Sequence, residues 1–278
     1  MKFTKMQGAG NDYVYVNCFA QTVSKPSELA RRVADRHFGI GGDGLVLIGR
    51  SSSADFSMRM YNADGSEAEM CGNAIRCVGK FVYERGLTGK STITVETLAG
   101  IKTLDLAIKN DRVARVTVDM GEPELRPAYI PVRFDGPEVT NRPITVGGEH
   151  YAVTCVSMGN PHAVVFLDQI DALNLPRLGP KFEYHELFPD RINTEFVELT
   201  REDDHLRLRV WERGSGETLA CGTGTCAAVV ASVLGGYTGR SVAVSLRGGE
   251  LHVRWDESNN HVYLTGGAEF VFEAEMDV

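Results

Sequence analysis

Apolar and polar residues alternate along most of the chain, which is typical of β-strands with one buried face. In the first part the runs are Asp12–Cys18, Gly44–Ile48, Phe56–Tyr61, Thr92–Thr97, Ile101–Ile108 and Val113–Asp119. Later runs are Ile144–Val146, Tyr151–Val156, Ala163–Leu167, Ile192–Leu199, Leu206–Trp211, Ser241–Leu246, Leu251–Trp255, Val262–Thr265 and Ala268–Glu275. Turn signals between them predict mainly antiparallel neighbours, at Ala99-Gly100, Gly147-Gly148, Gly248-Gly249 and Asp256–Asn260.

Few segments have the periodicity of a helix. Glu28–His37 follows a proline and a serine, which suit a helix start. Asn73–Arg85 carries a helical apolar stripe and stops at a glycine, and a similar pattern covers Thr223–Leu234. The last two segments each begin directly after a Cys-Gly pair.

That coincidence belongs to a longer repeat. SMRMYNADGSEAEMCGNAIRC aligns with RLRVWERGSGETLACGTGTC, and Cys221 stands 150 positions after Cys71. Two more islands keep nearly the same offset, pairing Asn11 with Asn160 and Asp43 with Asn193. Three islands in one register predict two similarly folded halves.

The proline-rich stretch Met120–Pro143 is the natural crossover between the halves. We therefore expect an N-terminal domain over 1–120 and a C-terminal domain over 121–267, with 268–278 a candidate to return to the first domain. The expected fold is α+β, with two pseudo-symmetric domains, each a curled, mainly antiparallel, barrel-like sheet around a central helix. We expect the active site in the cleft between the halves.

Composition narrows the function classes. The chain has 278 residues, 43% hydrophobic and 24% charged, which is the balance of a soluble globular protein. A net charge of −8 disfavours nucleic acid as a partner, and no apolar run is long enough to span a membrane. The start shows no secretory signal, so we expect a cytoplasmic protein whose ligand is a small molecule.

The six cysteines give the strongest chemical signal. In a reducing compartment they do not imply a disulfide framework, and their spacings lack the CxxC pattern of zinc sites, so we expect no metal. We interpret four as small buried residues, namely Cys18, Cys77, Cys155 and Cys226. Cys71 and Cys221 differ because they are duplicated together with the helix starts that follow them.

A cysteine at a helix N-terminus has chemical uses. The positive end of the helix dipole stabilises a thiolate and can lower the thiol pKa toward neutrality. The free N–H groups that follow, at Gly72-Asn73 and Gly222-Thr223, suit a carboxylate. Two such thiols on opposite sides of a carbon stereocentre could invert it, because one removes a proton while the other delivers one.

At this point the sequence resembles a known family. NADGSEAEMCGNAIR (Asn62–Arg76) fits the signature N-x-D-G-S-x4-C-G-N-[GA]-x-R of diaminopimelate epimerases. GAGNDY, GIGGDG, MGNPH, RINTEF and WERGSGETLACGTG follow in that family's order, so the resemblance covers nearly the whole chain. CGTGT is shared with proline racemases, but these carry His after the first Cys-Gly, where this chain has Asn73.

The resemblance implies a cofactor-independent homodimeric enzyme that interconverts LL- and meso-2,6-diaminopimelate, in lysine and peptidoglycan precursor synthesis. Cys71 would be the proton donor and Cys221 the acceptor in the LL-to-meso direction, and His162 and Glu212 would tune them. The residues that would hold substrate are Asn11, Asn62, Gly72, Asn73, Asn160, Asn193, Glu212, Arg213, Gly222 and Thr223. One departure is Gly44, where some members place a substrate-binding glutamine.

These residue types suit a zwitterionic substrate. Asparagines offer donors and acceptors without adding charge, and Arg213 could bind the distal carboxylate bidentately. Simpler interpretations stay open: Asn11 and Asn160 as turn formers, and His162 as a partner of a local backbone group.

Rival functions fit less well. Gly39-x-Gly41-x-x-Gly44 matches a dinucleotide fingerprint, but here a helix precedes it and a strand follows. No lysine stands in a constellation suited to a pyridoxal imine. Three rival functions stay open: a proline racemase, an amino-acid binding protein, and a thiol–disulfide sensor that uses Cys71 and Cys221.

Overall fold

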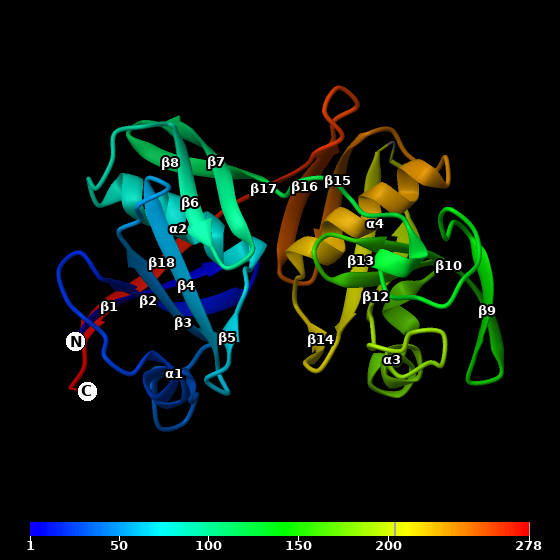
Figure 1. The fold of residues 1–278 in the computed structure, drawn as a ribbon, viewed down its shortest axis with the longest axis horizontal. Coiled ribbons are helices and arrows are strands. Elements are labelled where there is room, and N and C mark those ends of the chain that lie inside the picture. Colours follow the sequence, from blue (N-terminus) through cyan, green and yellow to red (C-terminus); the bar gives the residue numbers. More distant parts are fainter. Residues whose placement is uncertain (203, 278) are drawn as a thin grey trace. The chain divides into compact units, whose positions relative to one another are not determined.

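The computed structural model describes residues 1–202 and 204–277. The chain divides into two compact units, Met1–Asp119 with Thr265–Val278, and Met120–Leu264. Each unit combines a mixed β-sheet with two α-helices (Figure 1). The α+β fold class that the sequence predicts is confirmed.

The first unit is built on a sheet of mostly antiparallel strands. Its strands are β1 (Lys2–Gly8), β2 (Asn11–Asn17), β3 (Gly44–Gly49), β4 (Phe56–Asn62), β5 (Glu67–Ala68), β6 (Thr92–Thr97), β7 (Gly100–Lys109), β8 (Arg112–Asp119) and β18 (Glu269–Glu275). Pairing runs β18-β1-β2-β3-β4-β6-β7-β8, with β5 hairpinned to β4. The β2/β3 and β4/β6 pairs are parallel, and each crossover includes a helix. Among the described residues no pairing joins β8 to β18, so the sheet is not closed.

Those helices are α1 (Pro26–Ala34) and α2 (Gly72–Glu84). α2 packs against β1, β2, β7 and β8, whereas α1 packs against β2, β3 and β4. Every residue of α2 from Gly72 to Val82 is buried. Gly79 allows the close approach, because a Cβ there would lie 3.0 Å from the side chains of Leu104 and Leu106. α2 is therefore the core helix of this unit.

The second unit repeats this order of elements. Its strands are β9 (Arg142–Val146), β10 (Glu149–Ser157), β11 (Pro161–Phe166), β12 (Asn193–Leu199), β13 (His205–Glu212), β14 (Gly216–Thr218), β15 (Ser241–Leu246), β16 (Gly249–Trp255) and β17 (Val262–Gly266), which runs past the unit's last residue. Pairing runs β9-β10-β11-β12-β13-β15-β16, with β14 hairpinned to β13. The parallel pairs, β11/β12 and β13/β15, correspond to those of the first unit.

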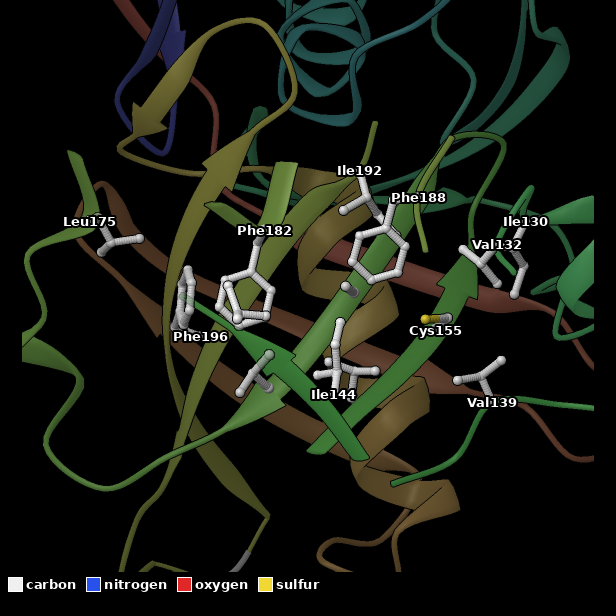
Figure 2. Packing of buried hydrophobic residues seen from close by; sticks show 14 of the residues in the cluster. Ile130, Val132, Val139, Ile144, Cys155, Leu175, Phe182, Phe188, Ile192 and Phe196 are labelled. Atoms are coloured by element: carbon white, nitrogen blue, oxygen red, sulfur yellow. The ribbon is translucent and has the colours of Figure 1, made fainter. Parts of the chain in front are cut away.

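Two helices and a cluster of apolar side chains complete this unit. α4 (Gly222–Leu234) packs against β10, β11, β12 and β16, and α3 (Leu175–Glu183) packs against β12, β13 and β14. Short 3-10 helices lie at Pro127–Tyr129 and Ile170–Ala172. Figure 2 shows the cluster, in which Phe182 of α3 meets Phe196 of β12 edge to face at 5.5 Å.

The two hairpins before the core helices show the repeat in side-chain detail. Arg59 of β4 donates to Glu67 of β5 at 2.7 Å, and Arg209 of β13 donates to Glu217 of β14 at 2.9 Å. Arg209 is buried and also binds backbone carbonyls at Ile170 and Leu173, which fixes the turn before α3.

The pattern of the sequence does not predict the strand β1 or the helix α3, nor the short strands β5 and β14 and the two 3-10 helices. The strand β1 is missed because Lys5 lies inside it, yet Lys5 is buried and ion-paired with Asp12 at 2.6 Å. α3 is missed because Pro180 stands inside it, whereas Pro176 lies in its first turn, where proline is tolerated. Its N-cap Asn174 accepts from the backbone N–H of Arg177 at 3.2 Å, which stabilises the first turn. In the described part of the chain no helix is long and apolar enough to cross a membrane.

Candidate functional site

Cys71 is the N-cap residue of the core helix α2. Its backbone is extended, with φ −135° and ψ 122°, and the helix begins at the next residue. The Sγ atom lies 3.1 Å from Oδ1 of Asn11, at the start of β2, and donates to it. The structure therefore brings together two residues that the sequence predicts for the site.

Asp43 fixes the orientation of the Asn11 amide. Its Oδ2 accepts from Nδ2 of Asn11 at 2.5 Å and from the backbone N–H of Asp12 at 3.0 Å. A carboxylate only accepts, so the amide nitrogen must face Asp43 and the amide oxygen must face the Cys71 thiol. Arg36 pairs with the other carboxylate oxygen at 3.2 Å. Asp43 belongs to the sequence repeat, but the repeat alone does not predict a role for it in the site.

The remaining predicted residues of this unit lie around the same helix start or the hairpin before it. Gly72 and Asn73 form the first turn of α2 and are buried. Asn62, at the end of β4, donates through Nδ2 to Ser66 Oγ at 3.0 Å.

Gly44 cannot be replaced by a longer residue without movement of the backbone. A Cβ at this position would lie 2.0 Å from the carbonyl oxygen of Tyr61 on the neighbouring strand β4. The local packing of this chain therefore leaves no room for a side chain at position 44, where the family resemblance raises the expectation of a glutamine.

Cys221 occupies the equivalent place in the second unit. It is the N-cap of α4, with φ −123° and ψ 117°, and it is 7% exposed. Its Sγ accepts from the backbone N–H of Gly224 at 3.4 Å and lies 3.5 Å from the Thr223 hydroxyl. The two N-cap cysteines therefore share one backbone geometry.

The expected lowering of the Cys221 pKa is wrong. Burial raises the pKa of this thiol well above its ordinary value, and the negative charges of Glu212 and Glu195 raise it further. The contacts with Thr223 and the Gly224 N–H act in the opposite direction but do not outweigh burial. Cys221 therefore rests as a protonated thiol.

Asn193, Glu212 and Arg213 lie where β12 begins and β13 ends. Asn193 is buried, accepts from the backbone N–H of Arg213 at 2.9 Å and donates to the Pro161 carbonyl at 2.7 Å. Arg213 uses Nη1 to bind the carbonyl of Asp190 at 3.0 Å, and Glu212 accepts from the Thr218 hydroxyl. Asn193 thus joins β11, β12 and the end of β13.

His162 pairs with a residue that sequence reasoning missed. Nδ1 of His162 lies 2.8 Å from Oε1 of Glu195, and Nε2 lies 3.0 Å from Oδ1 of Asn160. Both ring nitrogens thus bond to side chains rather than to a local backbone group. In the sequence, Glu195 is one polar residue of an alternating strand. The parallel pairing of β11 with β12 aligns His162 with Asn193, two residues before Glu195, and so brings Glu195 near His162.

Over residues 1–202 and 204–277, no group of three or more His, Cys, Asp or Glu side chains is placed to hold a metal ion. All six cysteines are free thiols.

Comparison with known proteins decides the family. The profile described as diaminopimelate epimerase matches residues 3–126 and 154–271. The chain belongs to the diaminopimelate epimerase family. It is 59% identical over 278 residues to a diaminopimelate epimerase of Acetivibrio thermocellus, covering 100% of this chain and 99% of that protein. It is 60% identical to one of Desulfovibrio desulfuricans, covering 99% and 98%. The chain is therefore an isomerase, as the sequence predicts.

Solved structures at low identity share the fold of this diaminopimelate epimerase family member. A Bacillus anthracis protein of the PhzF family, described as a phenazine biosynthesis protein, matches with a TM-score of 0.71 at 17% identity, covering 100% of this chain and 99% of that one. A probable proline racemase from Agrobacterium radiobacter matches with a TM-score of 0.74 at 15% identity, covering 100% and 93%. These likenesses support the α+β fold, and the individual site residues stay predictions.

Proposed function

We propose that this chain interconverts LL- and meso-2,6-diaminopimelate by moving a proton between Cys71 and Cys221. The observation that carries the proposal is the repeated N-cap cysteine, which stands at the start of the core helix in both units with the same extended backbone. Membership of the diaminopimelate epimerase family supports the substrate. Asn11 contacts the Cys71 thiol, and Gly222 and Thr223 begin the helix that Cys221 caps, which supports the assignment.

Two-base chemistry assigns complementary protonation states to the thiols. In the LL-to-meso direction Cys221 accepts the α-proton as a thiolate while Cys71 donates as a thiol, and the roles exchange in reverse. The raised pKa of Cys221 makes its thiol form the resting donor for the meso-to-LL direction and its thiolate a strong base. The mechanism requires both thiols to reach one α-carbon from opposite faces.

Backbone N–H groups and an arginine side chain are suited to donate hydrogen bonds to the two substrate carboxylates. The N–H groups of the first turns of α2 and α4 suit the reacting α-carboxylate, because partial positive charge gathers at helix N-termini. Arg213 suits the distal carboxylate through its guanidinium fork. Two thiols supply both proton transfers, so the proposed reaction is cofactor-independent.

The family resemblance also suggests an oligomeric state, a location and a pathway. We propose a homodimeric, cytoplasmic enzyme of lysine and peptidoglycan precursor synthesis, with diaminopimelate as its small-molecule partner.

A turnover assay tests the proposed function. Reduced, purified protein incubated with LL-diaminopimelate is expected to form the meso isomer, measured by chiral chromatography, and to leave L-proline unchanged under the same conditions. Saturable binding of diaminopimelate without turnover would favour a binding protein. Racemisation of proline instead would favour the racemase.

A further inference from the structure

His162 and Glu195 form a fully buried polar pair within the second unit. They lie on the neighbouring parallel strands β11 and β12, and both side chains are 0% exposed. Burial of ionisable groups is costly unless each finds a partner, so this pair needs a role or a compensating contact. The next residue along β12, Phe196, points into the apolar cluster of Figure 2, and side chains alternate along a strand, so Glu195 faces the other side of the sheet.

The chemistry of the two contacting atoms shows which one is the donor in the hydrogen bond between His162 and Glu195. The Glu195 carboxylate can only accept, so the proton in the 2.8 Å contact with Oε1 sits on Nδ1 of His162. The other ring nitrogen, Nε2, lies 3.0 Å from Oδ1 of Asn160. An amide oxygen also only accepts, so Nε2 is the donor in this contact. The Asn160 side chain is partly exposed. A continuous chain therefore runs from a buried carboxylate through an imidazole to an amide that ligands can reach.

The same carboxylate is held against the helix start that carries Cys221. A Cβ on Gly224, in the first turn of α4, would lie 2.4 Å from Glu195 Oε1 and 3.3 Å from Cys221 Sγ. The charged and titratable groups that interact here are Glu195, His162, Cys221, Glu212 and Cys155. The negative charge of Glu195 raises the pKa of the Cys155 thiol and of the Cys221 thiol. Glu195 Oε2 is buried and has no hydrogen-bond partner among the described residues. The Glu195 carboxylate therefore lies on the face of the sheet that carries α4 and Cys221.

We propose that Glu195 is a positioning residue of the epimerase site: it accepts the Nδ1 proton of His162 and holds the ring so that Nε2 donates to the Asn160 amide oxygen, which the ligand can reach. This inference rests on the proposed function for its catalytic consequence. The physical principle is that a carboxylate that accepts from one imidazole nitrogen keeps that nitrogen protonated and fixes the orientation of the ring. Glu195 acts through His162 and does not itself touch substrate.

The direct test is to determine by NMR which ring nitrogens of His162 carry a proton in solution. In protein labelled with ¹⁵N-histidine, the His162 signals are assigned by their loss in His162→Asn, and a protonated Nδ1 is expected in the wild type. Glu195→Gln removes the negative charge that favours the Nδ1 proton, so the Nδ1 proton is expected to be lost while Nε2, which donates to Asn160, stays protonated. The matched control is Glu198→Gln, on the same strand, where Glu198 is partly exposed and paired with Arg207 at 2.9 Å. This control should leave the His162 spectrum unchanged.

Kinetics provide the second readout. Glu195→Gln is expected to lower kcat by roughly 10- to 100-fold, which is typical when a carboxylate that orients a functional histidine is lost. Glu198→Gln should keep wild-type kcat and KM. An unaltered Nδ1 signal in Glu195→Gln, or an unprotonated Nδ1 in the wild type, overturns the proposal whatever the kinetics show.

A second variant keeps the test valid if Glu195→Gln does not fold. Gly224→Ala leaves Glu195 in place but directs a methyl group at its carboxylate, so the His162 spectrum is expected to change in the same direction. Gly89→Ala is its control, because a Cβ there meets nothing within 4 Å. An unchanged His162 spectrum in a folded Gly224→Ala protein counts against the proposal.

Failure of the proposed function would look different. If the wild-type protein does not epimerise diaminopimelate but the protonation of His162 Nδ1 still depends on Glu195, the positioning role stands and the reaction assignment falls. If epimerisation is normal and the protonation of Nδ1 is independent of Glu195, only the positioning role falls.

Discussion

Cys221→Ala is expected to lower kcat for diaminopimelate epimerisation by roughly 10²- to 10⁴-fold, because it removes one of the two proposed proton-transfer groups. Cys71→Ala should have an effect of similar size, since neither thiol can replace the other on the opposite face of the carbon. The measurement is the initial rate of meso isomer formation from LL-diaminopimelate at saturating substrate.

Buried cysteines in the same helices provide controls for these variants. Cys226 lies in α4 and Cys77 lies in α2, and both are 0% exposed. Cys226→Ala and Cys77→Ala are expected to keep kcat while losing stability, because each removes a packed sulfur atom. Wild-type turnover by Cys221→Ala, or loss of turnover in Cys226→Ala without unfolding, would contradict the assignment.

Gly44→Gln is expected to destabilise the protein by about 3 kcal/mol and not to create a further substrate contact. The cause is the backbone oxygen of Tyr61, 2.0 Å from where a Cβ would lie, which a rotamer change cannot relieve. The free energy of unfolding in urea measures the effect.

Gly44→Ala should show most of the same loss, because the clash begins at Cβ rather than further along the side chain. Gly89→Ala, at an open position, should change the free energy of unfolding much less. Gly44→Gln with wild-type stability would mean that β3 and β4 can separate to admit a side chain.

The core helices could be predicted from sequence to within a residue at either end. Asn73–Arg85 and Thr223–Leu234 were expected, and the helices are Gly72–Glu84 and Gly222–Leu234. Both carry long apolar patterns and stop at glycine, so local preference and burial agree.

α3 shows where local preference fails. Pro180, inside the helix, opposes helix formation in isolation, but Phe182 packs in the apolar cluster and the Asn174 cap satisfies the first turn. The repeat between the two halves predicts a helix here, because α3 is the counterpart of α1. Both helices are nine residues long and occupy equivalent places in their units.

The positioning residues were the hardest part of the site to predict. Asp43 and Glu195 act on Asn11 and His162, which lie 32 and 33 residues away in sequence. A carboxylate in an alternating strand is usually a solvated side chain, and only the parallel pairing of β2 with β3 and of β11 with β12 brings these partners together. The N-cap cysteines were predictable because each is marked by its own local motif.

The most direct test of two-base catalysis is the early distribution of deuterium when the protein acts on LL-diaminopimelate in D₂O. The donor thiol exchanges with solvent before it donates, whereas the acceptor thiol removes the substrate's own proton from the other face. Two-base catalysis predicts one deuterium at the inverted carbon of the meso product, while the recovered LL substrate stays unlabelled. Unlabelled meso product, or label entering recovered LL substrate as fast as product forms, would show that one base serves both faces and would contradict the two-thiol mechanism.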